Sequence, residues 1–236
     1  MPNWVQLLQP LQRSLLDMVL RAPCPLCDRT AQQGFCVSCA RQIQRCQLLD
    51  PQIYWQNPLP LFAWGQYGGA LKRAIATLKY ENHPELAEPL GQWTGQSWRT
   101  SGLATSRLVV LPIPMYRDKQ KQRGFNQAEL LARSFCQITR FSLKPEGLVR
   151  VRATEAQFGL SVIERQNNLA GAIQISPSAE NALKGKQVLL FDDIYTTGAT
   201  ARAAAAVLQQ AGIKVFGIVA IAAPSQMVSH PTAVNA

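Results

Sequence analysis

Two adjacent carboxylates, Asp192 and Asp193, stand directly after a short apolar run, Val188 to Phe191. A loop of threonine and glycine follows, and the helix-favouring run from Ala201 to Ala211 closes the segment. Open α/β sheets bind ligands beyond the carboxyl ends of their strands, and backbone N–H groups that open a helix attract anions. Because the carboxylates can accept hydrogen bonds from sugar hydroxyls and the loop can hold a phosphate, the segment predicts a sugar phosphate site.

The loop residues expected at the phosphate are Thr196, Thr197, Gly198, Ala199 and Thr200. Gly198 allows a close turn, and the threonine hydroxyls add hydrogen-bond donors. The alternative is an ordinary strand, turn and helix, with Asp193 or Thr196 as a helix cap. A cap needs one polar residue, whereas this loop offers two acids and three threonines. A nicotinamide site is less well supported, because no G-x-G-x-x-G follows an expected strand.

Four of the six cysteines form two C-x-x-C pairs, Cys24 with Cys27 and Cys36 with Cys39. Each pair can direct two thiolates at one centre, and four thiolates complete a tetrahedral Zn²⁺ site that leaves no open position for catalysis. The alternatives are a disulfide or redox pair, which a reducing compartment disfavours, and an iron–sulfur cluster. The spacing therefore favours a compact four-cysteine lobe around a structural zinc ion.

Strands and helices alternate along the rest of the chain, which is typical of a parallel sheet covered by helices. Apolar patterning places strands at residues 62–68 (a strand or a hairpin around Gly65), 108–113, 188–191 and 215–222. It places helices at residues 70–80, 125–140 and 201–211, and leaves 141–185 as a polar, irregular segment suited to a functional loop or lid. The predicted fold class is α/β, a parallel sheet flanked by helices, with a small N-terminal four-cysteine zinc lobe.

A proline-rich stretch divides the chain. Residues 1–20 have apolar residues at helical spacing, residues 24–46 hold the paired cysteines, and residues 47–60 contain three prolines, as linkers do. We therefore predict an N-terminal helix and four-cysteine zinc-finger lobe with linker over residues 1–60. The sheet and its helices then form a second domain over residues 61–236.

The composition favours a packed protein with anionic partners. The 236 residues are 47% hydrophobic and carry a formal charge of +10, which suits phosphates or nucleic acid or, in the plainer alternative, solubility alone. The first residues lack the basic segment of a secretory signal, and polar residues interrupt the first 20, so they cannot form a membrane span. We expect a cytoplasmic protein.

The segment from Val188 to Thr200 resembles the signature of the type I phosphoribosyltransferases. The resemblance implies that Asp192 and Asp193 hold the 2′ and 3′ hydroxyls of phosphoribosyl pyrophosphate (PRPP), bound with Mg²⁺. It implies that the five loop residues named above hold the 5′-phosphate.

The chain as a whole resembles the ComF family of ComFC and GntX-like proteins, over roughly residues 20 to 222. The matching pieces, in order, are the double C-x-x-C lobe, Tyr67 with Leu71 to Lys79-Tyr80, Leu111 to Pro114, Arg123 to Ala128, the group Arg152, Thr154, Gln157, Arg165 and Asn168, and the Asp-Asp loop. Many relatives carry glycine where this chain has Asn82, and asparagine tolerates the left-handed conformation that such a turn requires.

The resemblance implies a phosphoribosyltransferase-like domain joined to a zinc finger. It places Arg117, Lys121 and Arg123 near the pyrophosphate of PRPP; the alternative for each is an ordinary solvated surface residue. We expect the catalytic residues to be Asp192, Asp193, Arg123 and Arg165. Gly124 beside Arg123 permits an unusual backbone turn, and Arg165 either lies on a loop that closes over the site or anchors that loop. The resemblance implies a role in natural competence, in which the protein handles incoming single-stranded DNA beside a helicase-type protein partner that can hold it at the inner membrane. The alternatives are an active phosphoribosyltransferase with an unknown acceptor, unrelated to DNA uptake, and a PRPP-sensing regulator.

Overall fold

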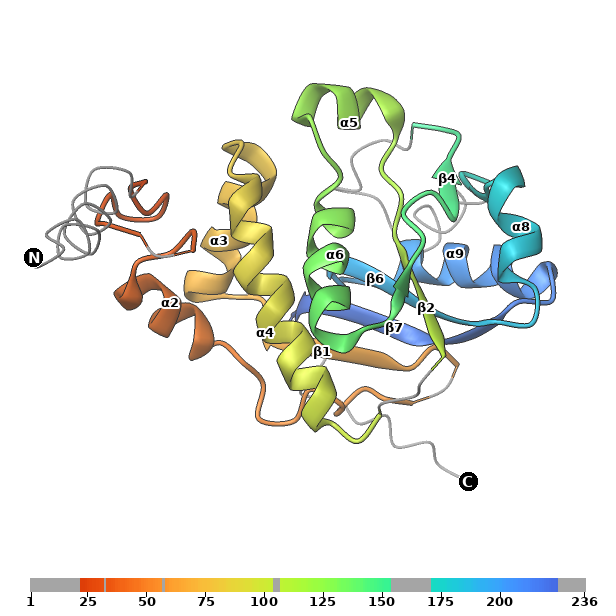
Figure 1. Cartoon of the computed structure of the whole chain (residues 1–236), viewed down its shortest axis with the longest axis horizontal. Coiled ribbons are helices and arrows are strands. Elements are labelled where there is room, and N and C mark those ends of the chain that lie inside the picture. Colours follow the sequence, from red (N-terminus) through yellow and green to blue (C-terminus); the bar gives the residue numbers. More distant parts are fainter. Residues whose placement is uncertain (1–21, 32, 57, 104–106, 154–170, 225–236) are drawn as a thin grey trace, which may run out of the picture.

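A computed structural model describes residues 22–31, 33–56, 58–103, 107–153 and 171–224 (Figure 1). Its centre is a five-stranded parallel sheet in the order β1-β7-β6-β2-β3, in which β6 is the middle strand. The strands are β1 (Leu61–Gln66), β2 (Leu108–Pro112), β3 (Ser142–Leu143), β6 (Gln187–Ile194) and β7 (Lys214–Ala223). A separate antiparallel pair consists of β4 (Leu148–Arg150) and β5 (Ile173–Ile175). The predicted α/β class is confirmed.

Helices cover both faces of the sheet (Figure 1). The helices of the described residues are α2 (Val37–Gln44), α3 (Gly69–Tyr80), α4 (Ala87–Thr100), α5 (Arg117–Arg123), α6 (Gln127–Thr139), α8 (Pro177–Leu183) and α9 (Ala199–Gln210), with a 3-10 turn at Pro84–Leu86. Leu189 and Phe191 of β6 share a core with α3, α4 and α6. Val188 and Leu190 share the opposite core with α9. The uninterrupted apolar run of β6 follows from this burial on both faces.

The four-cysteine lobe packs against the same core as α3 and α4. Phe35 stacks on Trp93 of α4 with ring centroids 5.9 Å apart, and Trp93 in turn stacks on Trp64 of β1 at 6.0 Å. Ile43 of α2 is fully buried in this cluster. The division of the chain into domains over 1–60 and 61–236 stays a prediction, and the helix expected over 1–20 lies outside the described residues.

Several elements differ from the expectation. The segment expected as a strand or hairpin at 62–68 is one strand, β1, parallel to β7. Helix α4 was not predicted, because Gly91 and Gly95 lower its helix propensity. Both glycines lie against α6, where an added Cβ at Gly95 would approach Ile138 Cβ to 2.8 Å, so close packing of two helices decides this element. The predicted irregular segment 141–185 contains β3, β4, β5 and α8 in its described parts.

Candidate functional site

The acid pair stands at the carboxyl end of β6, and its two side chains leave the sheet on opposite faces. Successive strand residues alternate in direction, so Asp193 follows Leu189 and Phe191 toward α3, and Asp192 follows Val188 and Leu190 toward α9. The Asp193 backbone N–H donates to Asp192 Oδ1 at 2.8 Å. The two carboxyls therefore have different surroundings although they are neighbours in sequence.

Lys79, near the end of α3, forms an ion pair with Asp193. Its Nζ lies 2.7 Å from Asp193 Oδ2, and the two side chains are 14% and 5% exposed. Burial alone lowers the pKa of Lys79, but the charge and hydrogen bond of Asp193 outweigh burial and leave that pKa above its ordinary value. The pair is therefore an ammonium and a carboxylate held together away from solvent.

Asp192 faces the loop that follows β6. Burial and the adjacent Asp193 raise the pKa of Asp192 to about 7, although Lys79 and Arg150 act in the other direction. Asp192 lines a small hollow of about 20 Å³ together with residues 194–201, which include the whole of the predicted phosphate loop. The structure thus brings Asp192 and the loop to one surface.

The loop turns at Gly198, which has a left-handed backbone with φ of +70° and directly precedes α9. A Cβ at Gly198 would overlap the Tyr195 hydroxyl and the Arg202 guanidinium. Arg202 Nη1 donates to the Thr197 carbonyl at 2.8 Å, and the Ala199 N–H donates to Thr197 Oγ1 at 3.4 Å. Side chains on both sides therefore fix the loop in a shape that opens the 12-residue helix α9 toward an anion.

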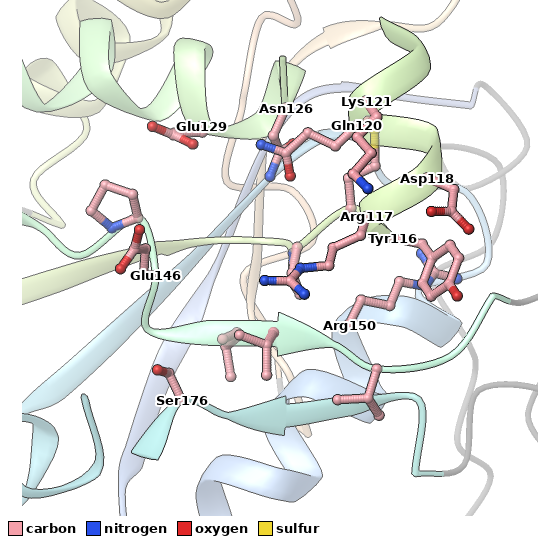
Figure 2. Close-up of a pocket in the computed structure, with 16 residues that line it drawn as sticks. Tyr116, Arg117, Asp118, Gln120, Lys121, Asn126, Glu129, Glu146, Arg150 and Ser176 are labelled. Atoms are coloured by element: carbon pink, nitrogen blue, oxygen red, sulfur yellow. The ribbon is translucent and has the colours of Figure 1, made fainter. Parts of the chain in front are cut away.

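A second, larger pocket of about 810 Å³ lies between α5, the start of α6 and β4 (Figure 2). Arg117 and Lys121 of α5 and Arg150 of β4 line it, and Figure 2 shows Arg117 reaching into it from α5. Glu129 and Glu146 line it too. Burial lowers the pKa of Arg150, and the charge of Asp192 opposes that effect. Arg150 therefore connects the large pocket electrostatically with the acid pair.

Arg123 is placed differently from Arg117 and Lys121. Its Nη1 donates to Gln127 Oε1, and its guanidinium lies 5.4 Å from the centre of the Tyr80 ring. Among the described residues, the lining of the large pocket does not include Arg123. The expected loop after Pro114 is largely helical, as α5, and Gly124 ends that helix with φ of +87°. Arg165, with the segment around it, lies outside the described residues.

Asn126 fastens the end of β2 to the start of α6. Its buried side chain donates from Nδ2 to the Ile113 carbonyl at 3.0 Å and accepts from the Ala128 N–H at 3.1 Å. The Ile113 N–H in turn donates to the Phe191 carbonyl of β6 at 2.8 Å. This chain of bonds holds Asn126, which lines the large pocket, beside the strand that carries the acids.

Sequence reasoning missed two residues of the site. Lys79 belongs to a motif that matched the ComF pattern, but nothing in the local sequence links it to Asp193. Arg150 lies on β4, inside the segment expected to be irregular. Asn82 adopts the left-handed conformation expected of it, with φ of +57°.

The four paired cysteines gather at one point. The Sγ atoms of Cys24, Cys27, Cys36 and Cys39 all lie within 4.8 Å of one another, and Cys27 Sγ is 3.5 Å from both Cys36 Sγ and Cys39 Sγ. Four thiolates around zinc at about 2.3 Å stand about 3.8 Å apart, so the spacing fits the ion. A hydrogen bond from the Cys39 N–H lowers the pKa of Cys36 to about 7, whereas burial and the neighbouring cysteines raise the pKa of Cys39. The cluster can hold zinc.

None of the helices in the described part of the chain is both long and apolar enough to cross a membrane.

Comparison with known proteins identifies the family of the chain. The sequence model of a protein family, the phosphoribosyl transferase domain, matches residues 77–234. The chain is similar to Competence protein ComFC of Bacillus subtilis, with 26% identity over 85% of this chain and 77% of the relative. It is similar to Competence protein F of Haemophilus influenzae, with 27% identity over 78% of this chain and 88% of the relative. It is also similar to DNA utilization protein YhgH of Escherichia coli O157:H7, with 27% identity over 80% of this chain and 85% of the relative. These names confirm the resemblance to the ComF family.

Proposed function

The chain belongs to the phosphoribosyl transferase domain family, and on that premise we propose that it binds PRPP with Mg²⁺ at the carboxyl end of β6. The ribose hydroxyls meet the acid pair, Asp192 and Asp193. The 5′-phosphate enters the loop of Thr196, Thr197, Gly198, Ala199 and Thr200. The protein uses this site in natural competence, where it handles incoming single-stranded DNA.

One observation supports the ligand above the others. Asp192 and the loop turned at Gly198 line the same hollow, at the point where α9 begins. A carboxyl there accepts hydrogen bonds, while the backbone N–H groups of the loop and the helix dipole attract an anion. A ligand with a diol at one end and a phosphate at the other can contact both the Asp192 carboxyl and the loop.

The large pocket favours the second candidate, an active phosphoribosyltransferase with an unknown acceptor. Arg117, Lys121 and Arg150 line this pocket together with the acids Asp118, Glu129 and Glu146. The three cations can stabilise the departure of a multiply charged pyrophosphate, and Arg150 also interacts with the charge of Asp192. Bound Mg²⁺ would add charge neutralisation through the phosphate oxygens, with few protein ligands. Arg123 acts at the edge of this region through Gln127 and Tyr80, and Arg165 remains a proposed catalytic residue on the sequence argument alone.

The competence role draws on the names of the relatives and on the charge of the chain. Of the three relatives described above, two are named competence proteins and one is named a DNA utilization protein. A chain with a formal charge of +10 can attract a phosphodiester backbone. A helicase-type partner and attachment to the inner membrane through that partner belong to the same proposal.

Calorimetric titration of PRPP with Mg²⁺ tests the ligand. The double variant Asp192→Asn/Asp193→Asn should bind about 100-fold more weakly or not detectably, because two acceptors for the ribose hydroxyls lose their charge. Asp50→Asn, at an exposed carboxyl in the linker, serves as the control and should bind like the wild type. Equal affinity in the double variant and the wild type would remove the ribose assignment.

Two further measurements separate the candidate functions. Single-stranded DNA affinity should fall steeply as salt rises from about 50 to about 200 mM if phosphate contacts carry the binding. Pyrophosphate release from PRPP, screened across bases and amines, identifies an acceptor if the protein is an enzyme. A DNA affinity that does not change with salt concentration would count against the competence role as stated. PRPP binding without release of pyrophosphate would favour a PRPP-sensing regulator.

A further inference from the structure

We propose that Lys79 is a positioning residue for the acid pair, and that it divides the pair into two roles. Asp193 is the carboxylate that Lys79 holds in place, and Asp192 is the carboxyl that meets the ligand directly. This inference rests on the proposed function, because the ligand is the sugar phosphate considered above. It refines that function by giving the two neighbouring acids unequal parts.

The ion pair occupies Asp193 on the side of the sheet away from the phosphate loop. Lys79 Nζ lies 2.7 Å from Asp193 Oδ2, and the Asp193 side chain is 5% exposed. An unpaired carboxylate at such a depth would be costly, since loss of one partner of a buried ion pair leaves an uncompensated charge. Lys79 therefore holds the Asp193 carboxyl in its orientation.

A chain of contacts carries this orientation to Asp192. The Asp193 backbone N–H donates to Asp192 Oδ1 at 2.8 Å, so the placement of the strand at Asp193 sets the direction of the Asp192 carboxyl. Asp192 then lines the hollow with the phosphate loop, whereas the residues that line that hollow do not include Asp193. Lys79 acts on the ligand through two intervening contacts and does not touch it.

The charges explain why such a residue is needed. Two adjacent carboxylates disfavour each other's ionised form, and Asp192 accepts stronger hydrogen bonds from a diol when it is ionised. Lys79 places one positive charge beside the pair. Its field also lowers the pKa of Asp192, against the larger effects of burial and Asp193. Removal of Lys79 should therefore weaken ligand binding and move the pH dependence of binding upward.

A double-mutant cycle on the full chain tests the inference. Lys79→Met, Asp193→Asn and the combined variant are titrated with PRPP and Mg²⁺ between about pH 6 and pH 8.5. Lys79→Met should weaken binding about tenfold at pH 7 and less at pH 8.5, because the Asp192 carboxyl holds its proton longer. At pH 8.5, where the direct effect of Lys79 on the ionisation of Asp192 is smallest, the combined variant should bind no more weakly than Asp193→Asn, and Lys79→Arg should restore most of the affinity. Arg73→Met, at an exposed position of the same helix, should bind like the wild type.

Thermal unfolding of the same variants covers the case in which Lys79→Met does not fold. The combined variant replaces both charges by neutral groups, so it should be more stable than Lys79→Met alone. Additive losses of affinity in the cycle, or Lys79→Met behaving like Arg73→Met, would overturn the positioning role while PRPP binding by the wild type still stands. No PRPP binding by the wild type would remove the proposed function and this inference together.

Discussion

Asp192 is the residue whose chemistry depends most on its surroundings. Its pKa is raised to about 7 by burial and by Asp193, against Lys79 on α3 and Arg150 on β4. Between about pH 4 and pH 7 the folded protein therefore holds a proton that the unfolded chain has released. The free energy of unfolding must fall as pH rises through this window, whereas Lys79, with its raised pKa, stays charged throughout it.

Asp192→Asn removes this loss, because an amide does not ionise. On going from about pH 4.5 to about pH 8, the free energy of unfolding of this variant should rise by about 1–3 kcal/mol relative to that of the wild type. Urea unfolding at the two pH values measures the difference. Asp50→Asn should show no such gain, and a constant offset for Asp192→Asn at both values would contradict the raised pKa.

At this scale the sequence predicted that Asp192 and the loop after it lie together, as the structure shows, and it missed Lys79 and Arg150, which approach the acid pair from elsewhere in the chain. Asp192 and the loop from Thr196 to Thr200 are close in sequence, and neighbouring residues at the end of a buried strand must lie together. Lys79 reaches Asp193 from a helix far away in the chain, and Arg150 comes from a strand that pairs outside the main sheet. Contacts of this kind depend on tertiary packing, which the spacing of residues within one short segment does not predict.

Among the elements, the turn between β6 and α9 is the most constrained. Gly198 has φ of +70°, and a Cβ there would overlap Tyr195 and Arg202. Gly212, after the same helix, has φ of +72° but no atom within 4 Å of an added Cβ. The two glycines share the left-handed backbone and differ in the space around them.

Gly198→Ala should therefore cost more than Gly212→Ala. We expect about 1–2 kcal/mol for Gly212→Ala from the left-handed backbone alone, and about 1–3 kcal/mol beyond that for Gly198→Ala from overpacking. Thermal unfolding compares the stabilities of the two variants. Calorimetry with PRPP should show weaker binding for Gly198→Ala and unchanged binding for Gly212→Ala. Equal costs at both positions would mean that the loop adapts to a larger residue.

Elements with strong periodicity were predicted well, and those set by packing were not. The helix expected over residues 125–140 begins at Gln127 and ends at Thr139, and the expected strands at 108–113 and 215–222 are β2 and β7. Helix α4 has two glycines because α6 passes close to it, and α5 is a polar helix with no buried residue. Apolar periodicity cannot reveal a helix that buries nothing.

On the scale of the whole molecule, the four-cysteine lobe contributes to the main core. Phe35 stacks on Trp93, and Ile43 joins the cluster that includes Leu71 and Leu78 of α3. Metal binding to four thiolates stabilises such a lobe by several kcal/mol. Loss of the metal should therefore reduce the stability of the chain well beyond the lobe.

Elemental analysis should give about one zinc ion per chain, and Cys24→Ser should lose it. We expect chelation of the metal, or Cys24→Ser, to lower the melting temperature measured by circular dichroism by about 5 °C or more. Cys46→Ser is the control, because Cys46 is not among the four clustered cysteines and should retain the ion. Full stability of metal-free protein would show that packing alone holds the lobe.

Helix α3 is common to both ends of the molecule: its apolar side packs beside the four-cysteine lobe, and Lys79 in its last turn reaches Asp193. If binding at the cysteines changes the placement of α3, occupancy of the cysteines and occupancy of the proposed sugar site are thermodynamically linked through this helix. Such linkage is reciprocal. If zinc tightens PRPP binding by a given factor, PRPP must tighten zinc binding by the same factor, so a chelator competition alone would report ligand binding.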